Sequence, residues 1–117
     1  MYNRTIEIVR TVDTMTPGIS ARRLDDQFVR SVTGILANSF LAQHAAMKKE
    51  FIDCLSMALP SGNESKLWLS TLRDARNMSM TPFKLILAHL SAFCGVIAAA
   101  LLSAEKSLLK ETKLCNP

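Results

Sequence analysis

The sequence predicts an all-α protein, a single antiparallel up-down-up-down four-helix bundle. Apolar residues return every three or four positions along four stretches of the chain, which is the spacing of one face of a helix. Hydrophobic residues make up 49% of the 117 residues and aromatic residues only 6%, a composition that favours helix over sheet. We expect residues 1–111 to form this one domain and residues 112–117 to form a frayed tail.

The first two helices are separated by a strong break. Ile6, Val9 and Val12 form an apolar stripe that predicts a helix over residues 3–15. The next residues include Pro17, which together with a following glycine ends a helix. The second helix is expected to turn one apolar side to the core, formed by Leu24, Phe28, Val32, Ile35, Leu36 and Phe40.

The third helix contains a proline in its middle. Pro60 removes one backbone hydrogen bond, and Ser61 and Glu64 have the spacing of a capping box that would start a new helix. The segment is therefore either kinked or broken. We expect one helix over residues 47–76 with a kink near Pro60, because the apolar residues before and after the proline must face one core. These residues run from Phe51 to Leu59 and from Leu67 to Leu72.

The fourth helix is expected to start at Thr81 and Pro82 and to run to about Lys110. Residues 85–104 carry no charge and are long enough to span a bilayer. Charges close to both ends favour instead a buried helix in a soluble protein. In that interpretation the core receives Phe83, Leu87, Leu90 and Ile97, while Ala98, Ala99 and Ala100 allow another subunit to approach closely.

No pattern in the sequence predicts catalysis, a cofactor or a metal site, and we expect a protein that is not an enzyme. Nucleophile elbows, glycine-rich phosphate loops and H-E-x-x-H pairs are absent from the sequence. The two histidines, His44 and His89, fall on different predicted helices. Three cysteines without a CxxC pair argue against both a disulfide framework and a zinc site. With no signal-peptide pattern at the N-terminus, a reduced, cytoplasmic setting is expected.

The charge balance allows a nucleic-acid interface. The net charge is +4, a mild excess of basic groups. Exposed basic groups of the first three helices are the predicted phosphate contacts: Arg10, Arg22, Arg23, Arg30, Lys48 and Lys49. The alternative is that the three arginines of the second helix pair with Asp25, Asp26 and neighbouring subunits.

The middle of the chain resembles a known bacterial family. The run Gln27, Arg30, Ser31, Ile35, Ala37, Asn38, Ala42 and Gln43 is followed by Lys48, Lys49, Glu50 and Phe51, and then by Leu55 to Leu59, Glu64, Trp68 and Leu69. This order and spacing is similar to the four-helix-bundle family of the 23S ribosomal RNA intervening-sequence protein. The chain departs from the family pattern at Leu41, where an acid is common, and at Pro60, Gly62 and Asn63, where helix formers are usual.

The resemblance implies a non-enzymatic bundle that assembles as a ring-shaped homopentamer. A related branch, similar to the accessory protein of diversity-generating retroelements, implies RNA or DNA and a reverse transcriptase as partners. We therefore expect a homo-oligomer that associates with RNA or DNA without a membrane. Two alternatives remain: a scaffold that binds another protein and no nucleic acid, and a membrane-anchored protein that uses residues 85–104.

Overall fold

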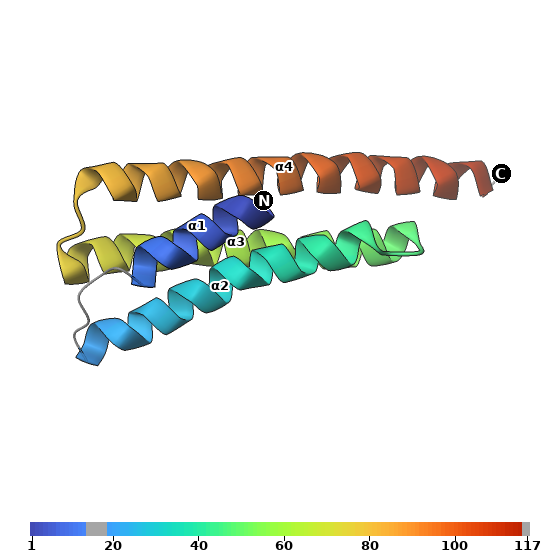
Figure 1. The fold of residues 1–117 in the computed structure, drawn as a ribbon. Coiled ribbons are helices and arrows are strands. Elements are labelled where there is room, and N and C mark those ends of the chain that lie inside the picture. The colour runs from blue at the N-terminus through green and yellow to red at the C-terminus, as the bar shows by residue number, and fades with distance from the viewer. Residues whose placement is uncertain (14–18, 116–117) are drawn as a thin grey trace.

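The computed structural model describes residues 1–13 and 19–115 and contains four α-helices in that part of the chain (Figure 1). They are α1 (Tyr2–Asp13), α2 (Ile19–Gln43), α3 (Lys48–Arg76) and α4 (Met80–Cys115). Successive helices run in opposite directions and lie side by side in an elongated molecule of 61 × 22 × 21 Å. The predicted fold class, an all-α antiparallel four-helix bundle, is confirmed.

The four helices differ greatly in length. At about 1.5 Å per residue, the 12 residues of α1 cover a third of the length of the 36-residue α4. Figure 1 shows α1 lying against the half of the bundle where α4 begins, with its N-terminus near the middle. The bundle therefore has four helices in one half and three in the other.

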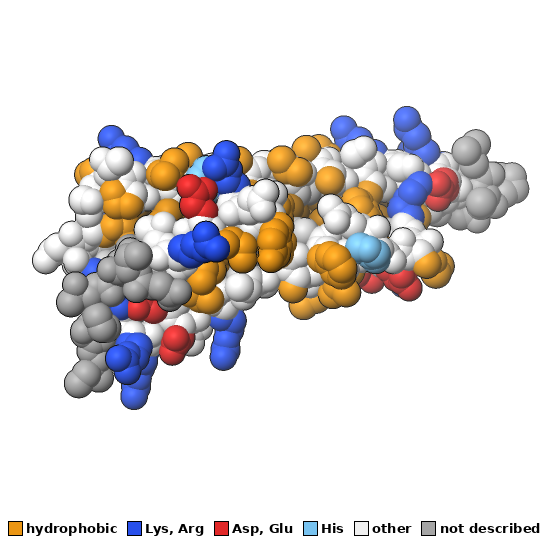
Figure 2. Space-filling view, viewed as in Figure 1, with side chains coloured by type: hydrophobic (Ala, Val, Ile, Leu, Met, Phe, Trp, Pro, Cys, Tyr) orange, Lys and Arg blue, Asp and Glu red, His pale blue; other side chains and the backbone are white. Residues whose placement is uncertain are grey.

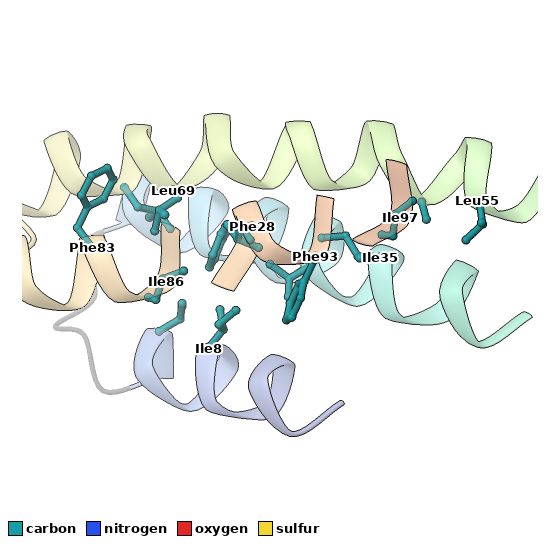
Figure 3. Close-up of a cluster of buried hydrophobic side chains, with 14 of the residues drawn as sticks. Ile8, Phe28, Ile35, Leu55, Leu69, Phe83, Ile86, Phe93 and Ile97 are labelled. Atoms are coloured by element: carbon teal, nitrogen blue, oxygen red, sulfur yellow. The ribbon is translucent and has the colours of Figure 1, made fainter. Parts of the chain in front are cut away.

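Large apolar side chains from all four helices meet in one core (Figure 3). The core is closed by α1 through Ile8 and Val12, which are 1% and 3% exposed. The predicted core positions that the structure buries are Phe28, Val32, Ile35, Leu55, Ala58, Leu69, Leu72, Phe83, Leu90 and Ile97. Leu24 and Leu87 are half-buried and pack against the core, and Leu36 is half-buried.

Two predicted core residues are exposed instead. Phe40 is 58% exposed and Leu67 is 60% exposed. Phe40 lies in the last turns of α2 beside the first residues of α1, where none of the described helices covers it. Leu67 lies two residues from Ser65 and two from Leu69, which are both fully buried. Two steps of about 100° turn its side chain away from the core.

The third helix is continuous through Pro60, which confirms that it does not break there. Pro60 is exposed, on the side of α3 that faces solvent, where a missing backbone hydrogen bond is least costly. The capping box is not used. Ser61 Oγ donates a hydrogen bond to the Met57 carbonyl (3.3 Å), and Glu64 accepts one from Trp68 Nε1 (3.0 Å). The kink at Pro60 stays a prediction.

Gly62 brings α3 and α4 close together. A Cβ atom built on Gly62 would lie 2.5 Å from the Sγ atom of Cys94, a buried residue of α4. The thiol therefore packs directly on the α3 backbone. A helix former at this position, as the family pattern would have it, fits only if the Cys94 sulfur moves or the two helices separate.

The α2–α3 hairpin also contains a polar pair inside the core. Ser65 Oγ donates to Ser31 Oγ at 2.9 Å, and both residues are buried. Ser31 Oγ donates in turn to the Phe28 carbonyl, and Ser65 Oγ lies 2.8 Å from the Ser61 carbonyl, so the one Ser65 proton is shared between that carbonyl and Ser31 Oγ. The pair is thus buried with its hydrogen bonds made.

The ends of α3 and α4 are set by local chemistry. Asn77 adopts a left-handed conformation (φ 51°, ψ 45°), and the backbone N–H groups of Asn77 and Met78 both donate to the Arg73 carbonyl. Asparagine tolerates this conformation better than most residues. The fourth helix begins at Met80, one residue before Thr81, and continues five residues past the predicted Lys110 to Cys115. The predicted frayed tail thus starts within the helix, and its last two residues lie outside the described part.

We predict that Gly62→Ala destabilises the protein by about 1–3 kcal/mol, because the added methyl group has to displace the Cys94 sulfur or separate two helices. Chemical denaturation followed by circular dichroism measures the change. The matched control is the same substitution in a Cys94→Ala background. The sulfur is absent there, so the penalty from Gly62→Ala should shrink by at least half; an equal penalty in both backgrounds contradicts the contact.

We predict that Pro60→Ala keeps the fold and leaves the free energy of unfolding equal or higher. Alanine restores an N–H donor in the middle of a helix, where proline is about 3 kcal/mol less favourable than alanine. Thermal unfolding of the two proteins makes the comparison. A lower melting temperature for the variant would mean that the proline shapes α3 in a way that the core requires.

Candidate nucleic-acid interface

Four of the six predicted phosphate-binding residues lie towards one end of the bundle. Arg10 is in the last turn of α1, and Arg22 and Arg23 are in the first turns of α2. The end of α1 and the start of α2 lie at the same end of the molecule (Figure 1), and Arg30 follows about two turns further along α2. All four side chains are exposed. We call Arg10, Arg22, Arg23 and Arg30 the basic end.

The arginines of the basic end are unpaired among the described residues. Arg22, Arg23 and Arg30 form no ion pair with any residue in that part of the chain, although Asp25 and Asp26 lie close in sequence. The alternative that these arginines pair with Asp25 and Asp26 is therefore not seen as an ion pair in the described part of the chain. It stays a prediction, as does pairing with a neighbouring subunit.

Asp25 is engaged from α3 instead. Its carboxylate accepts a hydrogen bond from the Arg76 guanidinium, in an ion pair that joins the start of α2 to the end of α3. The side chains of Arg76 and Asp25 are only 5% and 18% exposed. Burial makes this pair structural, and it leaves the positive charge of Arg22, Arg23 and Arg30 facing solvent.

Lys48 and Lys49 lie at the opposite end of the α2–α3 hairpin. The stretch of α2 from Arg23 to Gln43 separates them from Arg22 and Arg23 by about 30 Å, and Arg30 lies about 10 Å nearer. Lys48 Nζ donates to Ser107 Oγ at 2.7 Å and forms an ion pair with Glu111, so it anchors the far part of α4. Lys49 is exposed. The six predicted residues thus form two separate surfaces, and Lys48 is already engaged.

Figure 2 shows the distribution of charge on one face of the molecule. Lys and Arg side chains stand out over the first half of α2, over α1, and over both the first half and the far part of α4. Hydrophobic side chains occupy much of the surface in the middle of this face. The positive charge visible on this face is therefore spread over several helices.

The histidines occupy unrelated surroundings. His44 stacks against the Phe40 ring (4.4 Å between centroids) at the end of α2. His89 of α4 has its Nε2 atom 4.0 Å from the Glu7 carboxylate, which also pairs with Arg4. No group of three or more His, Cys, Asp or Glu residues in the described part of the chain is placed to hold a metal ion.

Two apolar surfaces were not predicted from the sequence. The first is a groove between the start of α1 and the second half of α2, lined by Tyr2, Leu36, Phe40 and Leu41 among others. Leu41, which replaces a common acid of the resembling family, is 55% exposed. The unequal spacing of the breaks in the sequence, which makes the first helix short, was the available signal for this groove.

The second apolar surface is the outer face of α4. Within one chain the expected burial of residues 85–104 holds for the side that faces the core, whereas on the outer face Leu85, Val96 and Leu102 are 51%, 65% and 54% exposed. Burial of that face against other subunits stays a prediction. The helix is long and apolar enough to cross a membrane, and only 28% of its most apolar stretch is buried. Ala98 and Ala99 are exposed as predicted for a subunit contact, whereas Ala100 packs partly against the core.

Comparison with known proteins places the fold. The chain is similar to a solved structure from Bacteroides thetaiotaomicron, described as a protein with unknown function from the S23 ribosomal protein family. The TM-score is 0.69 at 20% sequence identity, over 85% of this chain and 95% of the other. At this identity the likeness shows the four-helix fold. No family model matches the sequence, and no curated protein matches it.

We predict that Asp25→Ala costs about 3–5 kcal/mol of stability, because it leaves the Arg76 guanidinium buried without its carboxylate partner. Asp26→Ala, at the exposed neighbouring position, is the matched control and should change stability by less than about 0.5 kcal/mol. Urea denaturation of both variants measures the difference. Equal effects would mean that the α2–α3 ion pair contributes nothing specific.

Proposed function

We propose that this protein is a non-enzymatic, cytoplasmic homo-oligomer that associates with RNA or DNA through the basic end. The observation that carries the proposal is the unpaired state of Arg22, Arg23 and Arg30 among the described residues. Guanidinium groups exposed on one face can each contact a phosphate oxygen. Such contacts read the backbone, so the binding should depend little on sequence.

The net charge of one chain is modest, and assembly would multiply it. A charge of +4 gives a weak field for a single copy. Several basic ends brought together would produce a stronger one. The family resemblance implies a ring of five copies, and the sedimentation mass of the purified protein tests that number. A reverse transcriptase is a further proposed partner, suggested only by the resemblance to the accessory protein of diversity-generating retroelements.

The S23 ribosomal-family neighbour supports the proposal at the level of fold alone. Its own function is unknown. The competing scaffold hypothesis needs no basic surface, and it gains support if nucleic acid does not bind at low salt. The membrane hypothesis draws on the exposed face of α4, and detergent-free solubility counts against it.

We predict that Arg22→Gln with Arg23→Gln weakens binding to mixed-sequence RNA and single-stranded DNA, measured by fluorescence anisotropy at two salt concentrations. Each lost phosphate contact lowers the slope of log affinity against log salt by about 0.7–0.9, so the double variant should lose about 1.5.

Lys110→Gln with Lys113→Gln is the matched control, because it removes the same charge from exposed positions at the far end of α4. It should leave the slope nearly unchanged. Lys48→Gln with Lys49→Gln should have a smaller effect than the arginine pair, since Lys48 is already paired with Glu111. Equal losses in all three variants would mean that net charge, and not the basic end, governs binding.

A further inference from the structure

The outer face of α4 carries a regular repeat. Along this face the spacing between six residues alternates between three and four positions: Leu85, Ala88, Ala92, Gly95, Ala99 and Leu102. This is the spacing of the contact positions in a coiled coil. All six residues are exposed, and we call them the seam. The seam therefore has the pattern of a helix–helix contact, and none of the four described helices covers it.

The seam reads the same in both directions. Leucines stand at its two ends and four small residues lie between them, in the order large, small, small, small, small, large. A second copy of α4 placed antiparallel would set Leu85 against Leu102 of that copy, Ala88 against its Ala99, and Ala92 against its Gly95. A different partner would need no such symmetry, so the pattern favours a second copy of this chain.

Gly95 supports the same arrangement. A Cβ atom built on it meets nothing within 4 Å, so no contact within the chain requires glycine there. Glycine inside a helix costs about 1 kcal/mol relative to alanine. A neighbouring helix that approaches closely at this point would account for the residue, as Cys94 does for Gly62 on the other side.

The charges at the ends of the seam are complementary. Lys84 and Glu105 are exposed and form no ion pair with a described residue. They are three heptads apart, so they occupy the same flanking position of the repeat. In the antiparallel pair, Lys84 of each copy would lie beside Glu105 of the other. Because the antiparallel pair of helices has two-fold symmetry, this ion pair would form twice.

We propose that α4 pairs with α4 of a second copy of this chain, antiparallel and in the register that sets Leu85 against Leu102. Such a contact is isologous and closes at two copies. This inference rests on the self-association in the proposed function. It changes the expected number of chains, because the assembly then contains an even number, either as a dimer or as two rings joined through α4.

The register is tested by cross-linking. Leu85→Cys and Leu102→Cys are made separately, in a background with Cys54→Ala and Cys115→Ser that keeps the buried Cys94. A short bismaleimide should link the two variants when they are mixed, and neither variant to itself. Self-linking of Leu85→Cys would indicate parallel helices and would overturn the proposal, as would the absence of any link in a mixed sample.

The contact itself is tested with Gly95→Leu. The open space around Gly95 lets one chain accept the side chain, so thermal stability at low concentration should not fall, whereas the assembly should dissociate in sedimentation. Ala75→Leu, at an exposed position of α3, should leave the assembly intact. An assembly unchanged by Gly95→Leu overturns the proposal. A membrane role for this face would also overturn it: the purified wild-type protein would then bind phosphatidylcholine vesicles, and the two cysteine variants would no longer cross-link in their presence.

The two proposals fail separately. If the cross-link forms but no nucleic acid binds, the α4 contact stands and the nucleic-acid function is wrong. If nucleic acid binds with the expected salt dependence and the assembly has an odd number of chains, the α4 contact is wrong and the basic end stands.

Discussion

The rest of the structure depends on α3 being one unbroken helix. It packs against α2 along one side and against α4 along another, so the two largest contacts of the bundle share its backbone. On one turn of this helix Gly62 receives the sulfur of Cys94, and on the next Ser65 meets Ser31. A chain reversal at Pro60 would separate these contacts. The backbone hydrogen bond that proline removes is on the solvent side, where water can satisfy the free carbonyl.

The second determining feature is the short length of α1. A bundle of four equal helices buries the apolar face of each helix, whereas here α1 fills the fourth position over only about a third of the length of α4. Phe40, Leu41 and the start of α1 consequently form an exposed groove. The outer face of α4 is a second exposed apolar surface. Apolar surface of this extent is typical of proteins with further partners, which agrees with the proposed self-association.

Periodicity in the sequence predicted the helices and most of the core because it reports which side of a helix is apolar. It gave Phe28, Val32, Leu69 and Leu90 correctly, all of them 0% exposed. It failed at Phe40 because burial also requires a helix opposite, and no local pattern tells where a shorter neighbour stops. The Asp25–Arg76 pair was missed for a related reason: 51 residues separate the partners, and nearer arginines looked equally suitable. For the candidate site, the sequence located the basic groups but not which of them were already engaged.

The contact between Cys94 and Gly62 has a consequence for how the chain can be observed. Cys94 is buried and its sulfur packs against the α3 backbone, so a reagent reaches it slowly while α3 and α4 stay together. Alkylation of this sulfur then has to wait for the two helices to part, and its rate counts those partings. With Cys54→Ala and Cys115→Ser in place, the rate of Cys94 alkylation therefore reports how often α3 and α4 separate locally.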